Sequence, residues 1–321
     1  MANRKWLNRK VVGIGEAMVE FAPVGENIYR RGFAGDTLNT CWHIAKIVQD
    51  HGRVDYFTRV GTDAFSSEFL DFLAGSGLAS DSIARDAERS IGLYVISLAG
   101  AERSFSYWRD SAAARRLADD YDKLSKAISG AGLIHISGIT LAIIGEAGRR
   151  NLLKALDAAR SGGSMVSYDP NVRPRLWRDA AEMQSALREV LEVTDIALPS
   201  FDDEAKLWGD FDPEETVKRM TMAGVREIAV KNGQNSVALF IDGSLSRVPT
   251  PEVSNIRDTT GAGDSFNAGY LAGRLVGMTP SEACQLGQGV AGEVISHFGA
   301  LAPELALRRF HRRICDHVAE N

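Results

Sequence analysis

The segment Asp258-Thr-Thr-Gly-Ala-Gly-Asp264-Ser-Phe-Asn-Ala-Gly269 joins a glycine-rich turn to the beginning of a helical pattern. Gly261 and Gly263 allow the backbone to bend tightly and let a ligand approach it closely. Apolar side chains then recur at helical spacing, at Phe266, Tyr270, Leu271 and Leu275. We therefore expect a turn that leads into a helix N-terminus, where free N–H groups and the positive end of the helix dipole attract a phosphate.

A carboxylate follows this turn directly. Asp264 would stand beside the bound phosphate and accept the proton of a hydroxyl group that attacks it. This interpretation makes the segment a centre of phosphoryl transfer. A glycine-rich loop in which Asp264 only caps the following helix fits the same residues. The rest of the chain has to separate the two interpretations.

The composition is that of a globular protein from a reducing compartment. The chain has 321 residues, of which 45% are hydrophobic and 25% charged, and its net charge is −5. This charge gives no electrostatic reason to expect nucleic acid or a membrane surface as a partner. The three cysteines, Cys41, Cys284 and Cys315, are far apart and form no CxxC motif.

The first residues resemble the start of a signal peptide but lack its apolar core. Residues 1–10 are basic, and the apolar stretch Val11–Gly15 that follows them is stopped by Glu16. No apolar run approaches the ~20 residues that a membrane-spanning helix needs. We expect a cytoplasmic protein.

Short β-branched runs alternate with longer helical patterns along most of the chain. The expected strands are Val11–Gly15, Val54–Val60, Leu93–Leu98, Leu133–Ser137, Met165–Asp169, Asp195–Leu198, Glu227–Val230 and Val237–Ile241. The expected helices are Thr37–Gln49, Ser66–Ser76, Ile144–Ser161, Ala180–Val193, Pro213–Ala223, Asp264–Val276 and Pro280–His297. The last helix opens with Thr279-Pro-Ser-Glu282, which predicts a capping box. This alternation is typical of an α/β fold with a doubly wound, mainly parallel sheet and helices on both faces.

Two stretches break this rhythm, at about residues 16–34 and 90–109. Both are rich in strand-forming residues and contain no long helix, and the second is expected to turn near Gly100-Ala101. In an α/β protein such strands can form a small sheet over the site, a lid that excludes water. An antiparallel extension of the main sheet is the alternative.

Other nucleotide, metal and hydrolase motifs are incomplete or absent in the sequence. Gly13-Ile-Gly15 follows a strand, but Met18 occupies the third glycine position of a dinucleotide fingerprint. The sequence contains no GxxxxGK(S/T) P-loop and no HExxH motif, and its histidines show no metal spacing. A rival hydrolase interpretation makes Ser265 a nucleophile, with Asp316-His317 as its acid and base.

Three separated segments resemble the signatures of the ribokinase/PfkB family of carbohydrate kinases. They are Phe33-Ala-Gly-Asp-Thr-Leu-Asn39-Thr, Val60-Gly-Thr-Asp63 and Asp258-Thr-Thr-Gly-Ala-Gly-Asp264. The resemblance spans nearly the whole chain and implies one ribokinase-like kinase domain over residues 1–321. It implies a small β-sheet lid through which two copies usually form a homodimer. It also implies ATP as phosphoryl donor and a divalent metal, normally Mg2+. Some members also bind K+, which the sequence does not decide.

Within the family the chain is most similar to the 2-keto-3-deoxygluconate kinases. The similar segments are Gly15-Glu-Ala-Met-Val-Glu20, Gly35-Asp-Thr-Leu-Asn39, Gly92-Leu-Tyr94, Tyr107-Trp-Arg109 and Asp169-Pro-Asn-Val-Arg-Pro-Arg-Leu-Trp177. This resemblance implies transfer of the ATP γ-phosphate to O6 of that sugar acid, giving 2-keto-3-deoxy-6-phosphogluconate. The alternatives are another kinase of the family, such as a fructokinase or a deoxy-keto-gluconate relative, and a catalytically silent sugar-binding protein on the same fold.

The resemblance assigns the catalytic roles to the C-terminal signature. Asp264 matches the catalytic base of the family. The N–H groups of Gly261, Ala262 and Gly263 would stabilise the charge on the transferring phosphoryl group.

The N-terminal signature is expected to bind the sugar hydroxyls. Asp36 can accept hydrogen bonds from two hydroxyl groups, and Asn39 can both donate and accept. Gly35 lets a hydroxyl group approach the backbone. Ordinary helix capping by Asp36, Thr37 or Asn39 is the alternative.

The acidic group of the substrate is expected to be recognised by Tyr94, Tyr107, Arg109 and Arg173. An acid sugar needs a cation, and arginine binds a carboxylate through two parallel hydrogen bonds. Tyr107 and Arg109 are two apart on an expected strand and therefore face the same side. Arg173 follows a strand end, where α/β proteins place their ligands. The alternatives are a surface ion pair for Arg109 and a solvated basic loop for Arg173.

The ATP contacts are expected in two places. Lys231-Asn-Gly233 follows a strand and matches a loop that lies near the phosphates in the family. The adenine pocket is expected to involve Ala291–His297, in which the sequence singles out no residue.

The metal-linked NxxE motif of the family falls in Pro199–Glu204. Ser200 or Phe201 stands where the family has asparagine, which is a departure from its pattern. We expect Ser200 to contact ATP and Glu204 to serve Mg2+ through water, with Asp203 as the alternative acid.

Overall fold

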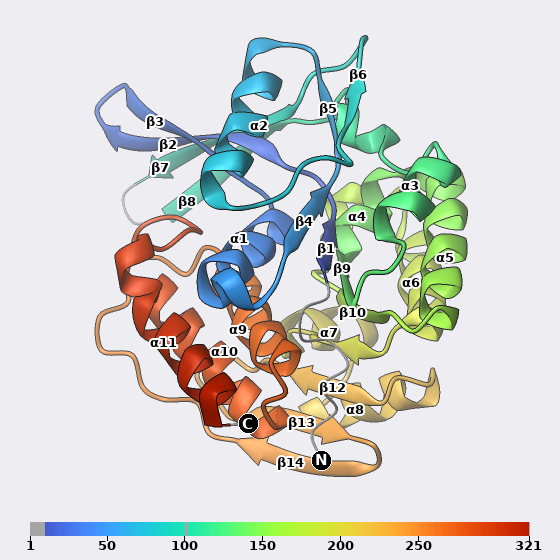
Figure 1. Cartoon of the computed structure of the whole chain (residues 1–321), viewed down its shortest axis with the longest axis vertical. Coiled ribbons are helices and arrows are strands. Elements are labelled where there is room, and N and C mark those ends of the chain that lie inside the picture. The colour runs from blue at the N-terminus through green and yellow to red at the C-terminus, as the bar shows by residue number, and fades with distance from the viewer. Residues whose placement is uncertain (1–9, 100–101, 321) are drawn as a thin grey trace.

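The computed structural model describes residues 10–99 and 102–320. Its main sheet has eight strands in the order β14-β13-β12-β11-β10-β9-β1-β4 (Figure 1). They are β1 (Val11–Ile14), β4 (Val54–Phe57), β9 (Leu133–Ser137), β10 (Met165–Asp169), β11 (Ile196–Ala197), β12 (Glu227–Val230), β13 (Val237–Ile241) and β14 (Ser244–Val248). All neighbours pair in parallel except β12 with β13 and β13 with β14. The predicted doubly wound, mainly parallel sheet is confirmed.

Helices build an apolar core on each face of this sheet (Figure 1). The first core receives α1 (Asp36–Val48), α2 (Ala64–Ser76), α9 (Ala262–Leu275), α10 (Pro280–Val294) and α11 (Glu304–Glu320). The second receives α3 (Tyr121–Ile128), α4 (Gly138–Ile143), α5 (Gly145–Ser161), α6 (Ala180–Glu189), α7 (Phe201–Trp208) and α8 (Pro213–Met222). Within β1, Val11 belongs to the first core and Val12 to the second, because successive side chains of a strand point to opposite faces.

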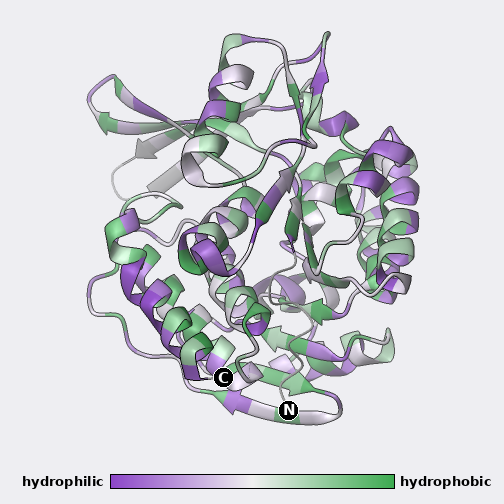
Figure 2. Cartoon of the chain, in the orientation of Figure 1, coloured by the Kyte–Doolittle hydropathy of each residue, from purple (hydrophilic) through white to green (hydrophobic). Residues whose placement is uncertain are grey.

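The hydropathy of the chain follows these layers. In Figure 2 the outer helices carry hydrophilic stripes, whereas hydrophobic residues lie toward the central strands. Among the described residues, no helix is both long enough and apolar enough to cross a bilayer. The predicted capping box at the start of α10 is confirmed, because Thr279 and Glu282 each accept a hydrogen bond from the other's backbone N–H.

A separate four-stranded sheet lies above one end of the main sheet (Figure 1). Its strands are β2 (Met18–Gly25), β3 (Ile28–Ala34), β7 (Gly92–Ala99) and β8 (Glu102–Trp108), in the order β3-β2-β7-β8. The two stretches that break the strand–helix rhythm therefore form a sheet of their own and do not extend the main sheet. The turn predicted at Gly100-Ala101 lies outside the described residues.

One predicted strand is divided in the structure, and one helix precedes a predicted helix. The sequence predicts one strand over Val54–Val60, but β4 lies at the sheet edge and ends at Phe57. The chain then leaves the main sheet, and β5 (Arg59–Gly61) pairs with β6 (Ala84–Asp86) instead. The predicted helix Ile144–Ser161 is confirmed as α5, which begins at Gly145 with a left-handed φ of 66° and follows the unpredicted helix α4.

The start of α9 is held in place by close packing against α10. A Cβ atom on Gly269 would lie 2.7 Å from the Cα of Gly287, which leaves no room for a side chain between the two backbones. Because the residues before Gly269 include the glycine turn and Asp264, this contact sets where that turn lies relative to the sheet.

We expect Gly269→Ala to destabilise the protein by about 1–3 kcal/mol, because the added methyl group overpacks a contact made by backbone atoms. Gly75→Ala is the matched control. It lies in α2, where a Cβ would meet no atom within 4 Å, and it should stabilise the protein by up to about 1 kcal/mol. Urea unfolding of the three proteins measures both effects, and equal stability of the two variants would contradict the close-packing explanation.

Candidate functional site

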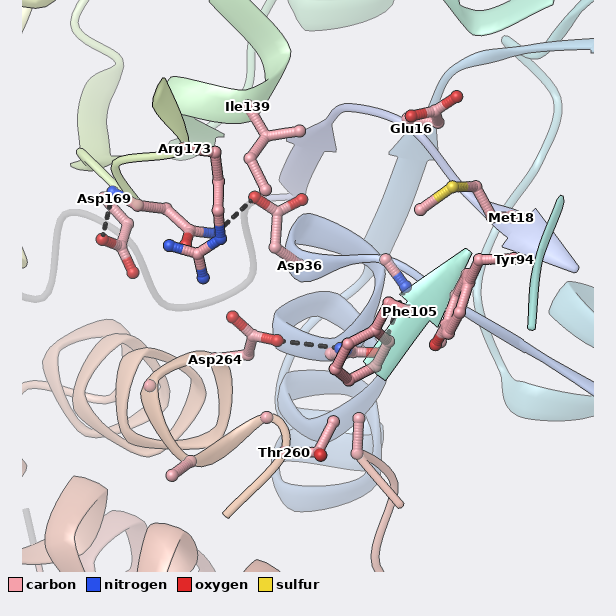
Figure 3. Close-up of a pocket in the computed structure, with 18 of the residues that line it drawn as sticks. Glu16, Met18, Asp36, Tyr94, Phe105, Ile139, Asp169, Arg173, Thr260 and Asp264 are labelled. Carbon is pink, nitrogen blue, oxygen red and sulfur yellow. Dashed lines mark hydrogen bonds between the residues drawn. The ribbon is translucent and has the colours of Figure 1, made fainter. Parts of the chain in front are cut away.

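A cavity of about 470 Å³ lies at the carboxyl ends of the parallel strands, between α1, the start of α9 and the small sheet (Figure 3). Every residue predicted to bind the sugar or to catalyse lines it: Gly35, Asp36, Asn39, Tyr94, Tyr107, Arg109, Arg173, Gly261, Ala262, Gly263 and Asp264. These residues are far apart in the sequence. The fold brings them to the edge of the sheet where α/β proteins bind their ligands.

Asp264 lies in the first turn of α9 and is partly exposed to the cavity. The Asn39 amide donates a hydrogen bond of 2.8 Å to its Oδ2. Burial, followed by the nearby charge of Asp36, raises the pKa of the Asp264 carboxyl to about 7, although the bond from Asn39 opposes the rise. A carboxyl group with this pKa can take up a proton near neutral pH, as a general base must.

The glycine turn before Asp264 presents backbone donors to the cavity. Gly261 has a left-handed φ of 74°, and a Cβ on it would lie 2.8 Å from that of Ala300, so both conformation and space require glycine here. The N–H of Ala262 already donates to the Thr259 carbonyl. Among the described residues, the N–H groups of Gly261 and Gly263 have no such acceptor. Of the three N–H groups predicted to bind the phosphoryl charge, that of Ala262 is therefore already engaged, which leaves those of Gly261 and Gly263.

Asp36 is oriented by donors from two strand ends. Ser137, at the end of β9, donates to its Oδ2, and Asn171, just beyond β10, donates to the same oxygen over 2.8 Å. The Thr37 N–H donates to Oδ1. Gly35 is the N-cap residue of α1, and a Cβ on it would lie 2.2 Å from the Glu16 carbonyl oxygen. Sequence reasoning assigns no role to Ser137 or to Asn171.

Two polar side chains from the small sheet and the residue that follows it are bonded to carboxylates. Tyr94 donates its hydroxyl hydrogen to Glu20, and Arg109 donates to Glu16. Arg109 and Glu16 are both buried, so the alternative of a surface ion pair is wrong. Burial raises the pKa of Glu16, against the opposing effect of Arg109.

Arg173 is the more accessible of the two arginines that line the cavity. Its side chain is 51% exposed, and its guanidinium lies 3.4 Å from Asp203. It also donates to the Val172 carbonyl. Figure 3 shows the guanidinium turned toward the same space as Asp36 and Asp264.

A second cavity of about 950 Å³ adjoins the first. The residues that line both are Ser200, Lys231, Thr259, Ala262 and Gly263. Gly233 lines the second cavity, and so do Ala291, Gly292 and Ile295 from the segment predicted to form an adenine pocket. The two cavities therefore meet at the glycine turn.

The acids expected to serve the metal lie in different surroundings. Glu204 is buried, lines neither cavity and accepts a 2.7 Å hydrogen bond from Arg219. Burial raises its pKa to about 7. Asp203, by contrast, lines the first cavity. Of the two acids, Asp203 is therefore the one that faces a cavity, whereas Glu204 is engaged by Arg219. Within the described residues, no cluster of three or more His, Cys, Asp or Glu side chains could hold a metal alone.

The rival hydrolase interpretation is wrong. Ser265 is fully buried in α9, and its hydroxyl donates to the Gly261 and Ala262 carbonyls of the preceding turn. A serine in this position has no access to a substrate.

Sequence reasoning missed several polar residues of the site. They are Glu16, Glu20, Ser137, Asp169, Asn171 and Asn267. The signal for three of them was available, because Ser137, Asp169 and Asn171 stand at or just after the ends of predicted strands. Asn267 is three residues after Asp264 and therefore on a neighbouring part of the α9 surface.

We expect Asp264→Asn to stabilise the ligand-free protein at about pH 8 more than at about pH 5. The raised pKa means that the folded state binds this proton more tightly than the unfolded chain. Stability therefore falls as the pH rises from about 4 to 7, and the asparagine variant escapes that loss. Thermal unfolding at both pH values measures it, with the exposed Asp157→Asn as control. A shift in Tm that does not depend on pH would contradict the unfavourable burial of the charge.

Comparison with known proteins identifies the family. A model of the pfkB family of carbohydrate kinases matches residues 8–306. The 2-dehydro-3-deoxygluconokinase of Dickeya dadantii is 41% identical over 302 residues, which cover 92% of this chain and 97% of that protein. The protein of the same name from Escherichia coli K12 is 39% identical over 308 residues, which cover 94% and 99%. An Escherichia coli ribokinase-type protein crystallised with ATP and Mg2+ has a TM-score of 0.82 at 24% identity, with 95% and 99% of the two chains covered. The chain belongs to the pfkB family of carbohydrate kinases.

Proposed function

We propose that the protein transfers the γ-phosphoryl group of ATP to O6 of 2-keto-3-deoxygluconate, the activity of a 2-dehydro-3-deoxygluconokinase. The observation that carries the proposal is the junction of the two cavities at Gly263, beside Asp264. A sugar in the first cavity and a nucleotide in the second would meet at this point. The names of the Dickeya and Escherichia coli relatives support the choice of sugar acid.

The proposed reaction uses Asp264 as the base. The sugar O6–H would donate to the Asp264 carboxylate, which takes the proton as the oxygen attacks the γ-phosphorus. The bond between that phosphorus and the bridging oxygen of ADP breaks at the same time. The N–H groups of Gly261 and Gly263, with the N-terminal end of α9, would stabilise the charge on the transferring group.

The sugar would be oriented by groups on both sides of the first cavity. Gly35, Asp36 and Asn39 would bind its hydroxyl groups from α1. Tyr94, Tyr107, Arg109 and Arg173 would surround its acidic end from the small sheet and from the chain after β10. Arg173 is the preferred partner for the carboxylate, because Arg109 is buried in its pair with Glu16, whereas Arg173 is half-exposed and lies 3.4 Å from Asp203.

ATP would lie in the second cavity with its phosphates at Ser200, Lys231 and Gly233. Asp203 and these residues suit Mg2+, which is usually held by one or two carboxylates together with substrate phosphates and waters. The ion would shield phosphate charge. The ATP and Mg2+ bound to the Escherichia coli protein of the same fold support this part of the proposal.

Residues 1–321 would act as one kinase unit in the cytoplasm, with the small sheet as its lid. We propose that two copies pair through the lids. Exposed apolar side chains on the lid support this: Val24, Ile28, Tyr29, Phe105 and Trp108. Light scattering that finds only monomers at micromolar concentration would exclude the dimer.

Asp264→Asn should lower kcat by about 10²–10⁴-fold, because it removes the proposed base while leaving the shape of the site. The assay couples ADP release to NADH oxidation, with 2-keto-3-deoxygluconate and fructose as acceptors, with and without K+. Wild-type enzyme should prefer the sugar acid, whereas a preference for fructose would favour a fructokinase. A near-normal kcat of the variant would contradict the role of Asp264, and an inactive wild type would favour a silent sugar-binding protein.

Arg173→Ala should raise KM for 2-keto-3-deoxygluconate by about 10-fold or more while KM for ATP changes less than about 2-fold, because a hydrogen bond to a charged group is lost. Arg175→Ala is the matched control, since this exposed arginine lies two residues away and lines neither cavity. Equal rises in both KM values would count against recognition of the acid by Arg173.

A further inference from the structure

The ammonium group of Lys231 lies where the two cavities meet. Lys231 follows β12 and is among the few residues that line both cavities. A Cβ built on Gly263, in the glycine turn, would lie 3.5 Å from the Lys231 Nζ. Any group that passes from the second cavity to the first along this turn therefore passes Lys231.

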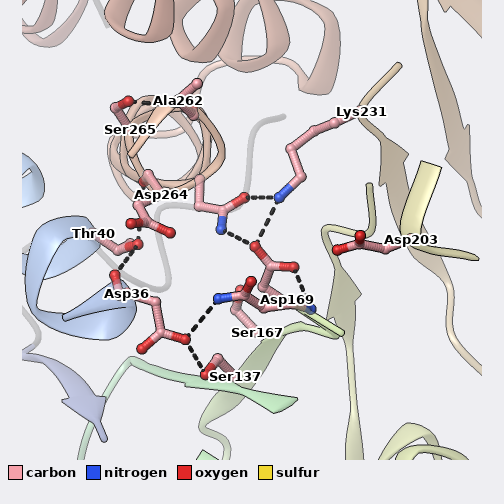
Figure 4. A network of polar contacts seen from close by, with 12 residues as sticks. Asp36, Thr40, Ser137, Ser167, Asp169, Asp203, Lys231, Ala262, Asp264 and Ser265 are labelled. Carbon is pink, nitrogen blue, oxygen red and sulfur yellow. Dashed lines mark hydrogen bonds and ion pairs between the residues drawn. The ribbon is translucent and has the colours of Figure 1, made fainter. Parts of the chain in front are cut away.

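Two buried side chains hold this ammonium group (Figure 4). Its Nζ donates to Asp169 Oδ2 over 2.7 Å and to Asn267 Oδ1 over 3.0 Å. Asn267 also donates to the same Asp169 oxygen, over 2.6 Å, which closes a triangle of three hydrogen bonds. Asp169 is 4% exposed and Asn267 is 1% exposed, so solvent barely reaches either anchor.

We infer that Asp169 and Asn267 are positioning residues that hold the Lys231 ammonium group in the path of the transferring phosphoryl group. The inference rests on the proposed kinase function and deepens it. Lys231 itself would be a catalytic residue, because its third N–H would contact the phosphoryl oxygens.

The chemistry of the ammonium group supports this arrangement. Lysine has three donors, and the triangle uses two of them, which leaves one for a ligand. A lysine side chain is flexible, so a fixed direction for its third donor requires anchors. Without anchors the group would lose rotational freedom at each turnover.

The charges around the site make a cation necessary there. Asp36, Asp169 and Asp264 surround the point of transfer and would repel a phosphoryl group that carries negative charge. Lys231 is the cation paired with Asp169, and it holds the pKa of that carboxyl below its usual range despite burial. A buried ion pair such as Lys231–Asp169 adds little net stability to the fold. We therefore attribute the position of this pair, at the junction of the two cavities, to function.

A double-mutant cycle on the full-length enzyme tests the inference. Lys231→Met should lower kcat by about 10²-fold or more, because one preorganised donor to the transition state is lost. Asp169→Asn should lower kcat by about 10-fold or more, with KM for ATP and for the sugar acid within about threefold. The double variant should be within about threefold of Lys231→Met, because Asp169 acts through the lysine. Losses that multiply in the double variant would overturn the inference.

The pH profile supplies a readout that a merely structural role would not move. The acidic limb of kcat/KM should shift to lower pH in Asp169→Asn, because the Asp169 charge helps to raise the pKa of Asp264. In Lys231→Met it should shift to higher pH, because the lysine opposes that rise. The charge of Asp36, which also raises the pKa of Asp264, is present in both variants and does not affect the comparison. An unmoved limb in both would contradict the inference.

Two further variants keep the test decisive. Asp242→Asn makes the same substitution at an exposed ion pair with Arg226, where neither residue lines a cavity, and should leave kcat unchanged. If Asp169→Asn does not fold, Asn267→Ala removes one anchor and should still lower kcat by about threefold or more without changing KM. An unchanged kcat in Asn267→Ala would overturn the inference. Wild-type enzyme that releases no ADP with any sugar acid would instead overturn the proposed function beneath it.

Discussion

Three carboxylates, Asp36, Asp169 and Asp264, lie close together in one cavity, and the properties of the site depend on how their charges are compensated. Each is stabilised differently, since Asp36 accepts three hydrogen bonds, Asp169 pairs with Lys231, and Asp264 receives a single amide from Asn39. The least compensated of the three is Asp264, and its pKa is raised to about 7. Unequal compensation thus separates Asp264, which can gain a proton near neutral pH, from Asp169, whose pKa is held below its usual range.

The three carboxylates differ in their partners because the fold brings the ends of different strands and helices to the cavity. Asp169 stands at the end of β10, and Lys231 stands just beyond β12, so both lie at one edge of the sheet. Asp264 approaches from α9, whose start is set by the glycine contact with α10. The small sheet closes the other side with side chains that already bond to each other, the ion pair of Arg109 with Glu16 and the hydrogen bond from Tyr94 to Glu20. Arg173 is the more exposed of the two arginines at this cavity.

Much of the fold could be predicted from periodicity, and much of the site from the two glycine-rich signatures. The alternation of strands and helices predicts the main sheet, while Asp36, Asn39 and Asp264 are named by their motifs. The partners of charged residues could not be predicted, because a buried pair such as Glu16 and Arg109 joins segments about ninety residues apart. Similarly, Glu204 was preferred as an acid for the metal, but Arg219 from α8 engages it. Only the packing of α7 against α8 brings them together.

The missed elements have simpler causes. α11 has a clear amphipathic pattern and was overlooked, whereas β5 is three residues long and too short for its period to be recognised. Its pairing with β6 depends on tertiary structure alone. The ends of predicted strands are the more useful lesson, because Ser137 and Asn171 lie there and orient Asp36.

The central claim is that Asp264 must lose its proton before the sugar hydroxyl can attack. The most direct measurement is kcat/KM for 2-keto-3-deoxygluconate as a function of pH, which reports the ionisation of the enzyme form that binds the sugar. With saturating ATP and Mg2+ held constant, the rate should rise through an acidic limb with an apparent pKa of about 7. A value of kcat/KM that stays flat from about pH 5 to 8 would contradict the account.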